Sequence, residues 1–132
     1  MNAVHQVKAN GEGLRRVYRA MFCSINGFRV AWRYEAAFRQ EVILSALLLV
    51  ASYFVAASVE HWCFLITSLF ILLAVEILNS AIETLADKIT LQHDELIKRA
   101  KDLGSAAVFI ALCLVFIIWG QALCAVVYRS MM

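Results

Sequence analysis

The sequence predicts an all-α membrane protein, in which each protomer has an N-terminal amphipathic surface helix followed by three transmembrane helices. Two observations predict this class. Hydrophobic residues make up 63% of the 132 residues, with a mean hydropathy of +0.76 and no proline, whereas soluble domains are nearer half apolar. The apolar residues also form three long runs, as expected of membrane helices, which need about 20 mainly apolar residues each.

We expect a single domain over residues 1–132, and its elements follow in order along the chain. The predicted amphipathic helix covers about 14–26, and the predicted membrane helices cover about 37–57, 62–86 and 101–127. In the first segment apolar residues recur at helical spacing opposite Arg15, Arg16 and Arg19. This pattern is typical of a helix that lies on an anionic membrane surface.

Three features are expected to separate these helices. Asn26-Gly27 predicts a break after the amphipathic helix, and Glu60-His61 predicts a very short turn between the first two membrane helices. The segment 88–100 is the longest polar stretch and is expected to connect the second and third membrane helices.

The distribution of positive charge predicts the orientation. Residues 1–41 contain seven Lys or Arg and residues 88–101 contain four, whereas the 57–61 turn contains none and the C-terminus one. Because cytoplasmic segments are enriched in Lys and Arg, the N-terminus is expected in the cytoplasm and the C-terminus on the opposite side of the membrane. We therefore expect a multi-pass membrane protein.

One stretch of the second membrane helix carries an unusual set of polar residues. It begins inside an apolar run at Glu76 and continues through Glu83 to Asp87, with Asn79 and Ser80 beside these acids. Because each helical residue turns about 100°, the three carboxylates fall within about 40° of one another. Ionisable groups within a membrane segment are costly and by default mark function. A helix that simply leaves the membrane would explain Asp87, but it does not explain Glu76.

The predicted topology brings this stripe to the same membrane boundary as Glu35 and Lys101-Asp102. Clustered carboxylates repel one another unless a cation joins them, and Mg²⁺ takes one or two carboxylates together with phosphate oxygens. The set therefore favours phosphoryl transfer to a lipid hydroxyl, with one acid holding the metal and another accepting the hydroxyl proton. Glu76 lies deepest, where a lipid hydroxyl would arrive.

Three motifs resemble the prokaryotic diacylglycerol kinase family. They are E-I-L-N-S-A-I-E-x-x-x-D (Glu76–Asp87), A-W-x-x-E-A-A-F-R-Q-E (Ala31–Glu41) and R-A-K-D-x-G-S-A-A (Arg99–Ala107). The motifs are long, specific and in the right order, and the resemblance covers roughly residues 14–123. Within the family, the chain is more similar to the Gram-negative diacylglycerol kinases than to the undecaprenol kinases of Gram-positive bacteria.

The resemblance implies ATP- and Mg²⁺-dependent phosphorylation of 1,2-diacylglycerol to phosphatidate at the cytoplasmic membrane face, by direct transfer of the γ-phosphoryl group to the primary hydroxyl. Glu76 matches the catalytic base, and Glu35 and Glu83 match the acids that hold Mg²⁺. The positions that match nucleotide-binding residues are Arg16, Cys23, Glu35, Asn79, Glu83, Gln92, His93, Asp94, Lys101 and Asp102. The positions that match lipid-binding residues are Arg16, Arg29, Ala31, Trp32, Phe38, Glu76 and Ser105. Cys23 stands where the family pattern leads us to expect an aromatic residue, and residues 92–94 fit the pattern less well than the rest.

The resemblance also implies a homotrimer with its sites at subunit interfaces. It places this trimer in the bacterial cytoplasmic (inner) membrane, so that the C-terminus would lie in the periplasm. Nucleic acid is not an expected partner, because the basic residues adjoin membrane segments. Three other functions remain open. A polyprenol kinase would use the same residues, and a small proton-coupled transporter would use Glu76 but leave Glu35 and Lys101-Asp102 without a role. A purely structural membrane scaffold would leave the buried acids unexplained.

The cysteines show no C-x-x-C spacing that would indicate a redox or metal site. They are Cys23, Cys63, Cys113 and Cys124, and three of them fall in predicted membrane spans. We expect small buried apolar residues with free thiols. A disulfide between Cys63 and Cys124, both near the non-cytoplasmic end, is the alternative.

Overall fold

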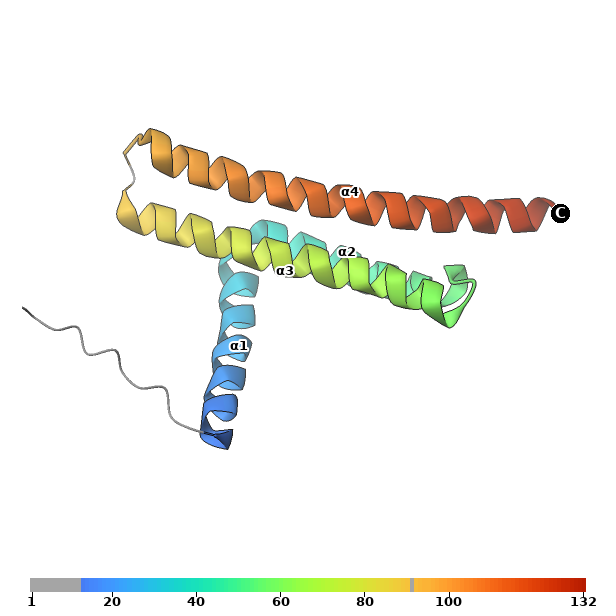
Figure 1. Ribbon diagram of the computed structural model, residues 1–132, viewed down its shortest axis with the longest axis horizontal. Coiled ribbons are helices and arrows are strands. Elements are labelled where there is room, and N and C mark those ends of the chain that lie inside the picture. Colours follow the sequence, from blue (N-terminus) through green and yellow to red (C-terminus); the bar gives the residue numbers. More distant parts are fainter. Residues whose placement is uncertain (1–12, 91) are drawn as a thin grey trace, which may run out of the picture.

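The computed structural model describes residues 13–90 and 92–132, and within them it contains four helices. These are α1 (Leu14–Tyr34), α2 (Ala36–Val55), α3 (Val59–Ile89) and α4 (Glu95–Met131). Helices α3 and α4 run antiparallel and side by side, α2 packs against α3, and α1 runs across the other helices rather than along them (Figure 1). The all-α prediction is confirmed, and α2, α3 and α4 are long and apolar enough to cross a membrane, as predicted.

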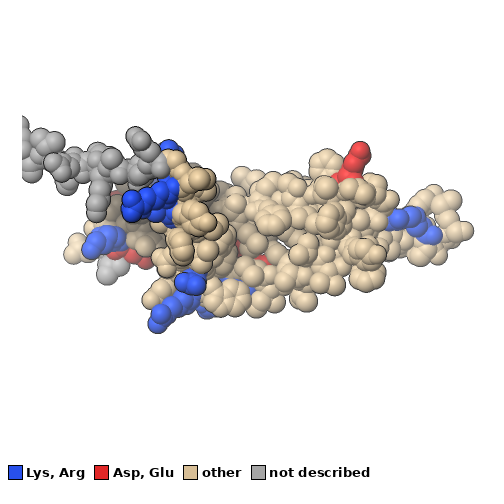
Figure 2. Space-filling view, turned by 90° about the horizontal axis from the view of Figure 1, so that it is seen from below, with Lys and Arg blue, Asp and Glu red and all other residues tan. Residues whose placement is uncertain are grey.

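Charged side chains gather toward the ends of the molecule. Figure 2 shows most Lys and Arg side chains near one end, with a broad band of uncharged side chains next to them. This band exposes large hydrophobic residues, among them Leu47, Phe70 and Phe116. Extensive exposed apolar surface on long helices fits a lipid environment rather than water. The chain is therefore a membrane protein.

Helix α1 is longer than the sequence predicted. The expected break at Asn26-Gly27 is absent, and the helix continues without interruption to Tyr34. A single glycine costs a helix only ~0.5–1 kcal/mol relative to alanine, which does not by itself end it. The space around Gly27 is open, with nothing within 4 Å of the position of a Cβ atom. Neither a turn nor a close contact therefore requires a glycine here.

The bend between α1 and α2 comes at Glu35. Its extended backbone (φ −102°, ψ 112°) ends α1 and begins α2. Arg39 fixes this corner, because its Nη1 donates hydrogen bonds to the carbonyl oxygens of Trp32 (3.0 Å) and Arg33 (3.3 Å). A cationic side chain on these carbonyls satisfies and complements the C-terminal end of α1. Because Glu35 is the residue at this corner, the hydrogen bonds of Arg39 help to fix its position between α1 and α2.

The turn between α2 and α3 covers residues 56–58 rather than the predicted Glu60-His61. Ser58 caps α3, since its Oγ accepts the backbone N–H of His61 at 3.1 Å. The Nδ1 of His61 in turn accepts the backbone N–H of Ala57 at 3.1 Å. Glu60 thus lies in the first turn of α3, where a negative charge complements the helix dipole.

The connection between α3 and α4 is shorter than the predicted polar segment 88–100. Helix α3 continues to Ile89, and α4 begins at Glu95. Asp94 caps α4, because its Oδ1 accepts the backbone N–H groups of Leu96 (2.9 Å) and Ile97 (3.0 Å). The charged residues around Lys101 are consequently held on a helix rather than on a loop.

The apolar core lies between α3 and α4. It is formed by Leu65, Leu69, Leu72, Ala111, Val115, Trp119 and Ala122. The leucines of α3 follow one another at intervals of four and three residues, so they form one row facing α4. Toward the α3–α4 connection, the buried positions of the same helix are Glu76, Ser80 and Ala86. Beyond Leu72, polar side chains thus take two of the three buried positions of α3.

Candidate active site

The deepest carboxylate is that of Glu76, which is only 4% exposed. It follows Leu72 by one helical turn and takes the place that a further leucine would fill in the α3 row. A buried acid costs several kcal/mol more than a leucine in such a position unless a partner compensates its charge. The sequence places Glu76 inside an apolar run, and the structure adds that its side chain is buried within the protein.

Three further acids surround Glu76 and form with it a group that we call the carboxylate layer. Glu35 and Glu83 are close enough for their charges to act on Glu76, and Glu41 of α2 interacts electrostatically with Glu76 in the same way. Glu35 comes from the α1–α2 corner and Glu83 from two turns further along α3. The structure thus brings Glu35 and Glu83 within electrostatic range of Glu76 and adds Glu41. Asp87, the third acid of the predicted stripe, instead pairs with Lys101 near the α3–α4 connection.

Unsatisfied polar atoms lie in the carboxylate layer and on residues within one helical turn of its acids. Glu41 Oε2, Ser45 Oγ, Asn79 Oδ1 and Ser80 Oγ are buried and have no hydrogen-bond partner among the described residues, and the same holds for Trp119 Nε1 in the apolar core. Ser45 lies one turn beyond Glu41 on α2, and Ser80 one turn beyond Glu76 on α3. Each unpaired buried polar group costs ~1–3 kcal/mol, and native proteins keep few of them. The concentration of four of these atoms in and beside the carboxylate layer indicates a place that a polar ligand would complete.

Asn79 connects the layer to helix α4. Its Nδ2 donates a hydrogen bond to Glu83 Oε1 at 3.2 Å, which orients that carboxylate. On the other side of the amide, Asn79 Oδ1 lies against the backbone of the buried Gly104.

A second, more polar group lies at the α3–α4 connection. Lys101 Nζ donates to Asp87 Oδ1 at 3.1 Å between the two helices, and Lys98 pairs with Asp102 at 2.6 Å along α4. These four residues line an open polar recess of about 290 Å³. The recess is also lined by Thr90, Gln92, His93, Asp94 and Ile97. The structure therefore gathers all five residues from 92 to 102 that the sequence assigned to nucleotide binding.

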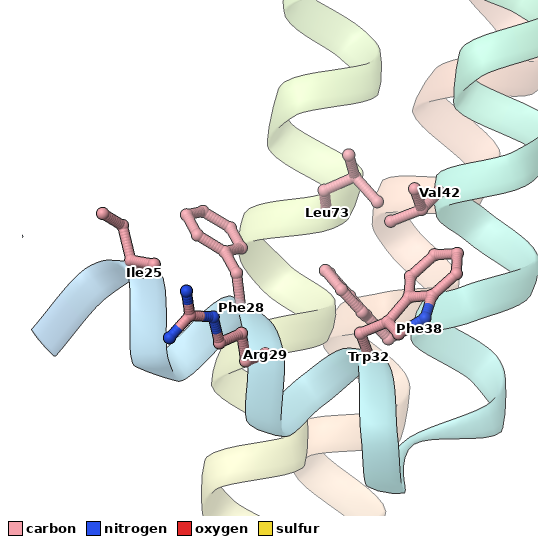
Figure 3. Close-up of a pocket in the computed structure, with 7 residues that line it drawn as sticks. All are labelled: Ile25, Phe28, Arg29, Trp32, Phe38, Val42 and Leu73. Atoms are coloured by element: carbon pink, nitrogen blue, oxygen red, sulfur yellow. The ribbon is translucent and has the colours of Figure 1, made fainter. Parts of the chain in front are cut away.

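An apolar recess of about 490 Å³ lies where α1, α2 and α3 meet. Its lining residues are Ile25, Phe28, Arg29, Trp32, Phe38, Val42 and Leu73. Figure 3 shows their rings and aliphatic side chains turned toward the space between the three helices. Because Val42 follows Glu41 directly and Leu73 precedes Glu76 by one turn, this recess adjoins the carboxylate layer.

Several of the residues predicted to contact ligands lie elsewhere in the chain. Arg16 and Cys23 are exposed on α1, which extends away from the other helices (Figure 1). Ser105 is exposed on α4 and does not line the apolar recess. Ala31 is buried on α1 at 5% exposure.

The cysteines differ from the sequence prediction in one respect. All four are free, as expected, but all four are exposed rather than buried. Residues such as Cys113 lie on helix surfaces that lipid or another protein chain can cover, so an apolar side chain need not face the core of the protomer.

Comparison with known proteins decides the family. The model of the prokaryotic diacylglycerol kinase family matches residues 22–123. The chain belongs to the prokaryotic diacylglycerol kinase family. The diacylglycerol kinase of Haemophilus influenzae is 40% identical over 111 residues, which cover 84% of this chain and 94% of that protein. That of Escherichia coli K12 is 43% identical over 110 residues, covering 83% and 90%. That of Helicobacter pylori 26695 is 38% identical over 120 residues, covering 91% and 94%.

Mg²⁺, which membership of the diacylglycerol kinase family implies, fits the donor atoms of the carboxylate layer. Glu35 and Glu83 offer carboxylate oxygens of the hard type that Mg²⁺ prefers, and both act electrostatically on the buried Glu76. The described residues contain no group of three or more His, Cys, Asp or Glu side chains arranged to hold a metal ion by themselves. An ion bound here would therefore need further oxygen ligands from a phosphate, which is the usual manner of Mg²⁺ at nucleotide sites.

Glu41 is the residue of this family member's site that sequence reasoning missed. It is the last residue of the A-W-x-x-E-A-A-F-R-Q-E motif and lies just before the uncharged part of α2. A charge at that boundary is normally interfacial, so it did not stand out. The sequence does hold a weak signal, because Glu41 and Ser45 are four residues apart and therefore lie on the same face of a helix that is otherwise mostly apolar.

Proposed function

We propose that the chain is a lipid kinase that transfers the γ-phosphoryl group of ATP to the primary hydroxyl of 1,2-diacylglycerol, giving phosphatidate and ADP. Family membership supports the class of reaction. The observation that carries the proposal is the burial of Glu76 one turn from Leu73 of the apolar recess, among acids of the α1–α2 corner, α2 and α3. Helix packing alone gives no reason for an acid there, whereas proton abstraction from a lipid hydroxyl does.

Glu76 is the general base in this proposal. Its carboxylate takes the proton of the lipid hydroxyl, the hydroxyl oxygen attacks the γ-phosphorus, and the bond to the β–γ bridging oxygen breaks to release ADP. The transfer is direct, so no phosphorylated side chain is formed.

The apolar recess would hold the acyl chains of the lipid. Three of the residues expected to contact lipid, Arg29, Trp32 and Phe38, line it. Its aromatic and aliphatic lining suits hydrocarbon, and the guanidinium of Arg29 suits the ester or headgroup region. Because Leu73 lies one turn before Glu76, a lipid in this recess would present its hydroxyl close to the base.

Glu35 and Glu83 would hold Mg²⁺, with Asn79 beside the phosphates. When bound, the ion supplies charge neutralisation for the phosphate oxygens during transfer. The hydrogen bond from Asn79 supports this role for Glu83, because a positioned carboxylate loses less entropy on binding. Glu41 adds a second acid next to the base.

Lys101 and Asp102, with residues 92–94, would bind the nucleotide in the polar recess. Lys101 would exchange its hydrogen bond to Asp87 for one to a phosphate oxygen.

Arg16 and Cys23 lie apart from this recess within one chain, so we assign their nucleotide contacts to a neighbouring copy in a homotrimer. The ten buried hydrophobic residues of the described chain make a small core, which supports further burial through symmetric assembly.

We further propose that the protein is a multi-pass component of the bacterial inner membrane, with α1 on the cytoplasmic surface and the C-terminus in the periplasm. The seven Lys and Arg of residues 1–41 and the four of residues 88–101 support this orientation. It would expose the carboxylate layer and the polar recess to cytoplasmic ATP.

The deciding experiment is turnover of radiolabelled ATP by detergent-purified protein, with diacylglycerol and undecaprenol offered in parallel and with either Mg²⁺ or EDTA. Label in phosphatidate that requires Mg²⁺ is the expected result. Label only in polyprenyl phosphate would keep the chemistry and change the substrate. Absence of transfer to either lipid by folded protein would refute the kinase proposal and favour the transporter.

A further inference from the structure

Gly104 of α4 faces Asn79 of α3 at a place where a side chain does not fit. A Cβ atom at this position would lie 2.3 Å from Asn79 Oδ1, 3.4 Å from Asn79 Cγ and 3.6 Å from Ile82 Cδ1. The first distance is far below van der Waals contact. By contrast, Gly120 on the same helix has nothing within 4 Å of its Cβ position. Close approach of α3 and α4 thus requires glycine at residue 104 only.

The close contact restricts the amide of Asn79 to one arrangement. Its Oδ1 is buried against Gly104 without a hydrogen-bond partner, while Nδ2 reaches Glu83 Oε1 at 3.2 Å. Turning the amide over would place an oxygen against the carboxylate of Glu83, where two acceptors repel each other. The backbone of Gly104 and the carboxylate of Glu83 therefore hold the amide between them, one on each side.

We propose that Gly104 is a positioning residue for phosphoryl transfer, which acts through the Asn79 amide on the carboxylate of Glu83. This inference rests on the proposed kinase function, and the observation that supports it is the Gly104–Asn79–Glu83 geometry. Gly104 contributes no reacting group. By lacking a Cβ atom it leaves room for the amide, and the amide directs Glu83 toward the place where phosphate-bound Mg²⁺ would lie.

The substitution Gly104→Ala tests this arrangement. The clashing atom belongs to the end of a side chain, so we expect the added methyl group to displace the Asn79 amide while the helix pair stays folded. A hydrogen bond to a charged group is then lost, which predicts a fall in kcat of roughly tenfold or more. The Mg²⁺ concentration for half-maximal activity should rise with it, whereas KM for diacylglycerol should stay as in the wild type. Gly120→Ala, on the same helix in open space, is the matched control and should change none of these values.

The decisive comparison is a double-mutant cycle with Asn79→Ala. If Gly104 acts through Asn79, then Gly104→Ala adds little further loss once the amide has been removed. Additive losses would mean that Gly104 serves only the packing of α3 on α4, and the proposal would be wrong. Should the single variant Gly104→Ala not fold at all, folding of the double variant with Asn79→Ala would support the proposed contact between Gly104 and Asn79. Failure of both variants to fold would overturn the proposal.

A binding measurement separates this inference from the kinase proposal. Mn²⁺ binding in the presence of a non-hydrolysable ATP analogue, followed by electron paramagnetic resonance, needs no lipid and no turnover. We expect weaker Mn²⁺ binding in Gly104→Ala than in Gly120→Ala. If the wild type binds Mn²⁺ but phosphorylates no lipid, the kinase proposal fails, whereas a difference in Mn²⁺ binding between the two glycine variants would still show that Gly104 positions Glu83 through Asn79. Equal Mn²⁺ binding and equal activity in the two glycine variants would refute the inference alone.

Discussion

Lys101 on α4 donates a hydrogen bond to Asp87 on α3 at 3.1 Å, which links residues 14 apart in the sequence at the entrance of the polar recess. If Lys101 exchanges this partner for a nucleotide phosphate, Asp87 competes with ATP. We therefore expect Asp87→Asn to lower KM for ATP by a few-fold, because both side chains are partly exposed and exposed ion pairs are weak. Steady-state kinetics at saturating diacylglycerol measure this.

A substitution of Lys101, the other partner of this ion pair, gives the control. Lys101→Met removes the proposed phosphate contact and should raise KM for ATP. Should both variants raise KM equally, the ion pair would serve only to join the two helices, and the exchange of partners would be excluded.

Glu76→Gln tests the catalytic base. The amide fits the same space but cannot accept the hydroxyl proton, so we expect phosphatidate formation to fall by roughly 10²–10⁴-fold. Binding of an ATP analogue, measured by fluorescence titration, should remain largely intact. Glu60→Gln, at the opposite end of the same helix, is the control and should leave both values unchanged. Joint loss of nucleotide binding and activity in Glu76→Gln would contradict its assignment as the base.

Glu35→Gln and Glu83→Gln test the metal assignment. Each removes one charged oxygen ligand, so each variant should need a higher Mg²⁺ concentration for half-maximal activity, by roughly tenfold or more. Titration of activity with Mg²⁺ at constant free ATP measures the change. An unaltered Mg²⁺ dependence in both variants would remove these residues from the metal site.

The membrane helices and the unusual position of Glu76 could be predicted from the sequence because lipid imposes a simple rule, whereas the roles expected of Glu35 and Glu83 came from the family motifs. Segments facing hydrocarbon must be apolar, so the uncharged runs and the exceptional Glu76 were visible without a structure. The same rule explains the wrong prediction for the cysteines. In a chain surrounded by lipid, an apolar residue such as Cys113 can face outward as readily as inward.

The corner at Glu35 and the contact between Gly104 and Asn79 could not be predicted in the same way. No glycine or proline marks the corner, and Asn26-Gly27, which carries the stronger breaker signal, stays helical. The corner depends instead on hydrogen bonds from Arg39 to the end of α1. The contact of Gly104 depends on how α3 and α4 align, a tertiary property that local periodicity does not fix.

Trp62→Phe should affect stability without affecting catalysis. Trp62 Nε1 donates to Ser52 Oγ at 3.0 Å, and Ser52 is fully buried at the end of α2 far along the helices from the carboxylate layer. Loss of this hydrogen bond should lower the free energy of unfolding by about 1 kcal/mol. Unfolding in mixed micelles measures it, with Tyr128→Phe, an exposed aromatic at the same end, as the control. A reduced kcat with unchanged stability would instead show that this end of the bundle contributes to turnover.

Leu73→Trp tests whether the apolar recess holds the acyl chains of the substrate. The larger ring would occupy part of the 490 Å³ between α1, α2 and α3 and leave less room for hydrocarbon. We expect KM for diacylglycerol to rise by roughly tenfold, a loss comparable to removing one or two buried methylene groups from a binding pocket. KM for ATP should not change, because the polar recess lies at the α3–α4 connection. Leu47→Trp, on an exposed face of α2, controls for the bulk of the new side chain. If both variants keep the wild-type KM for diacylglycerol, the lipid binds elsewhere on the protein and Glu76 must receive its hydroxyl from another side.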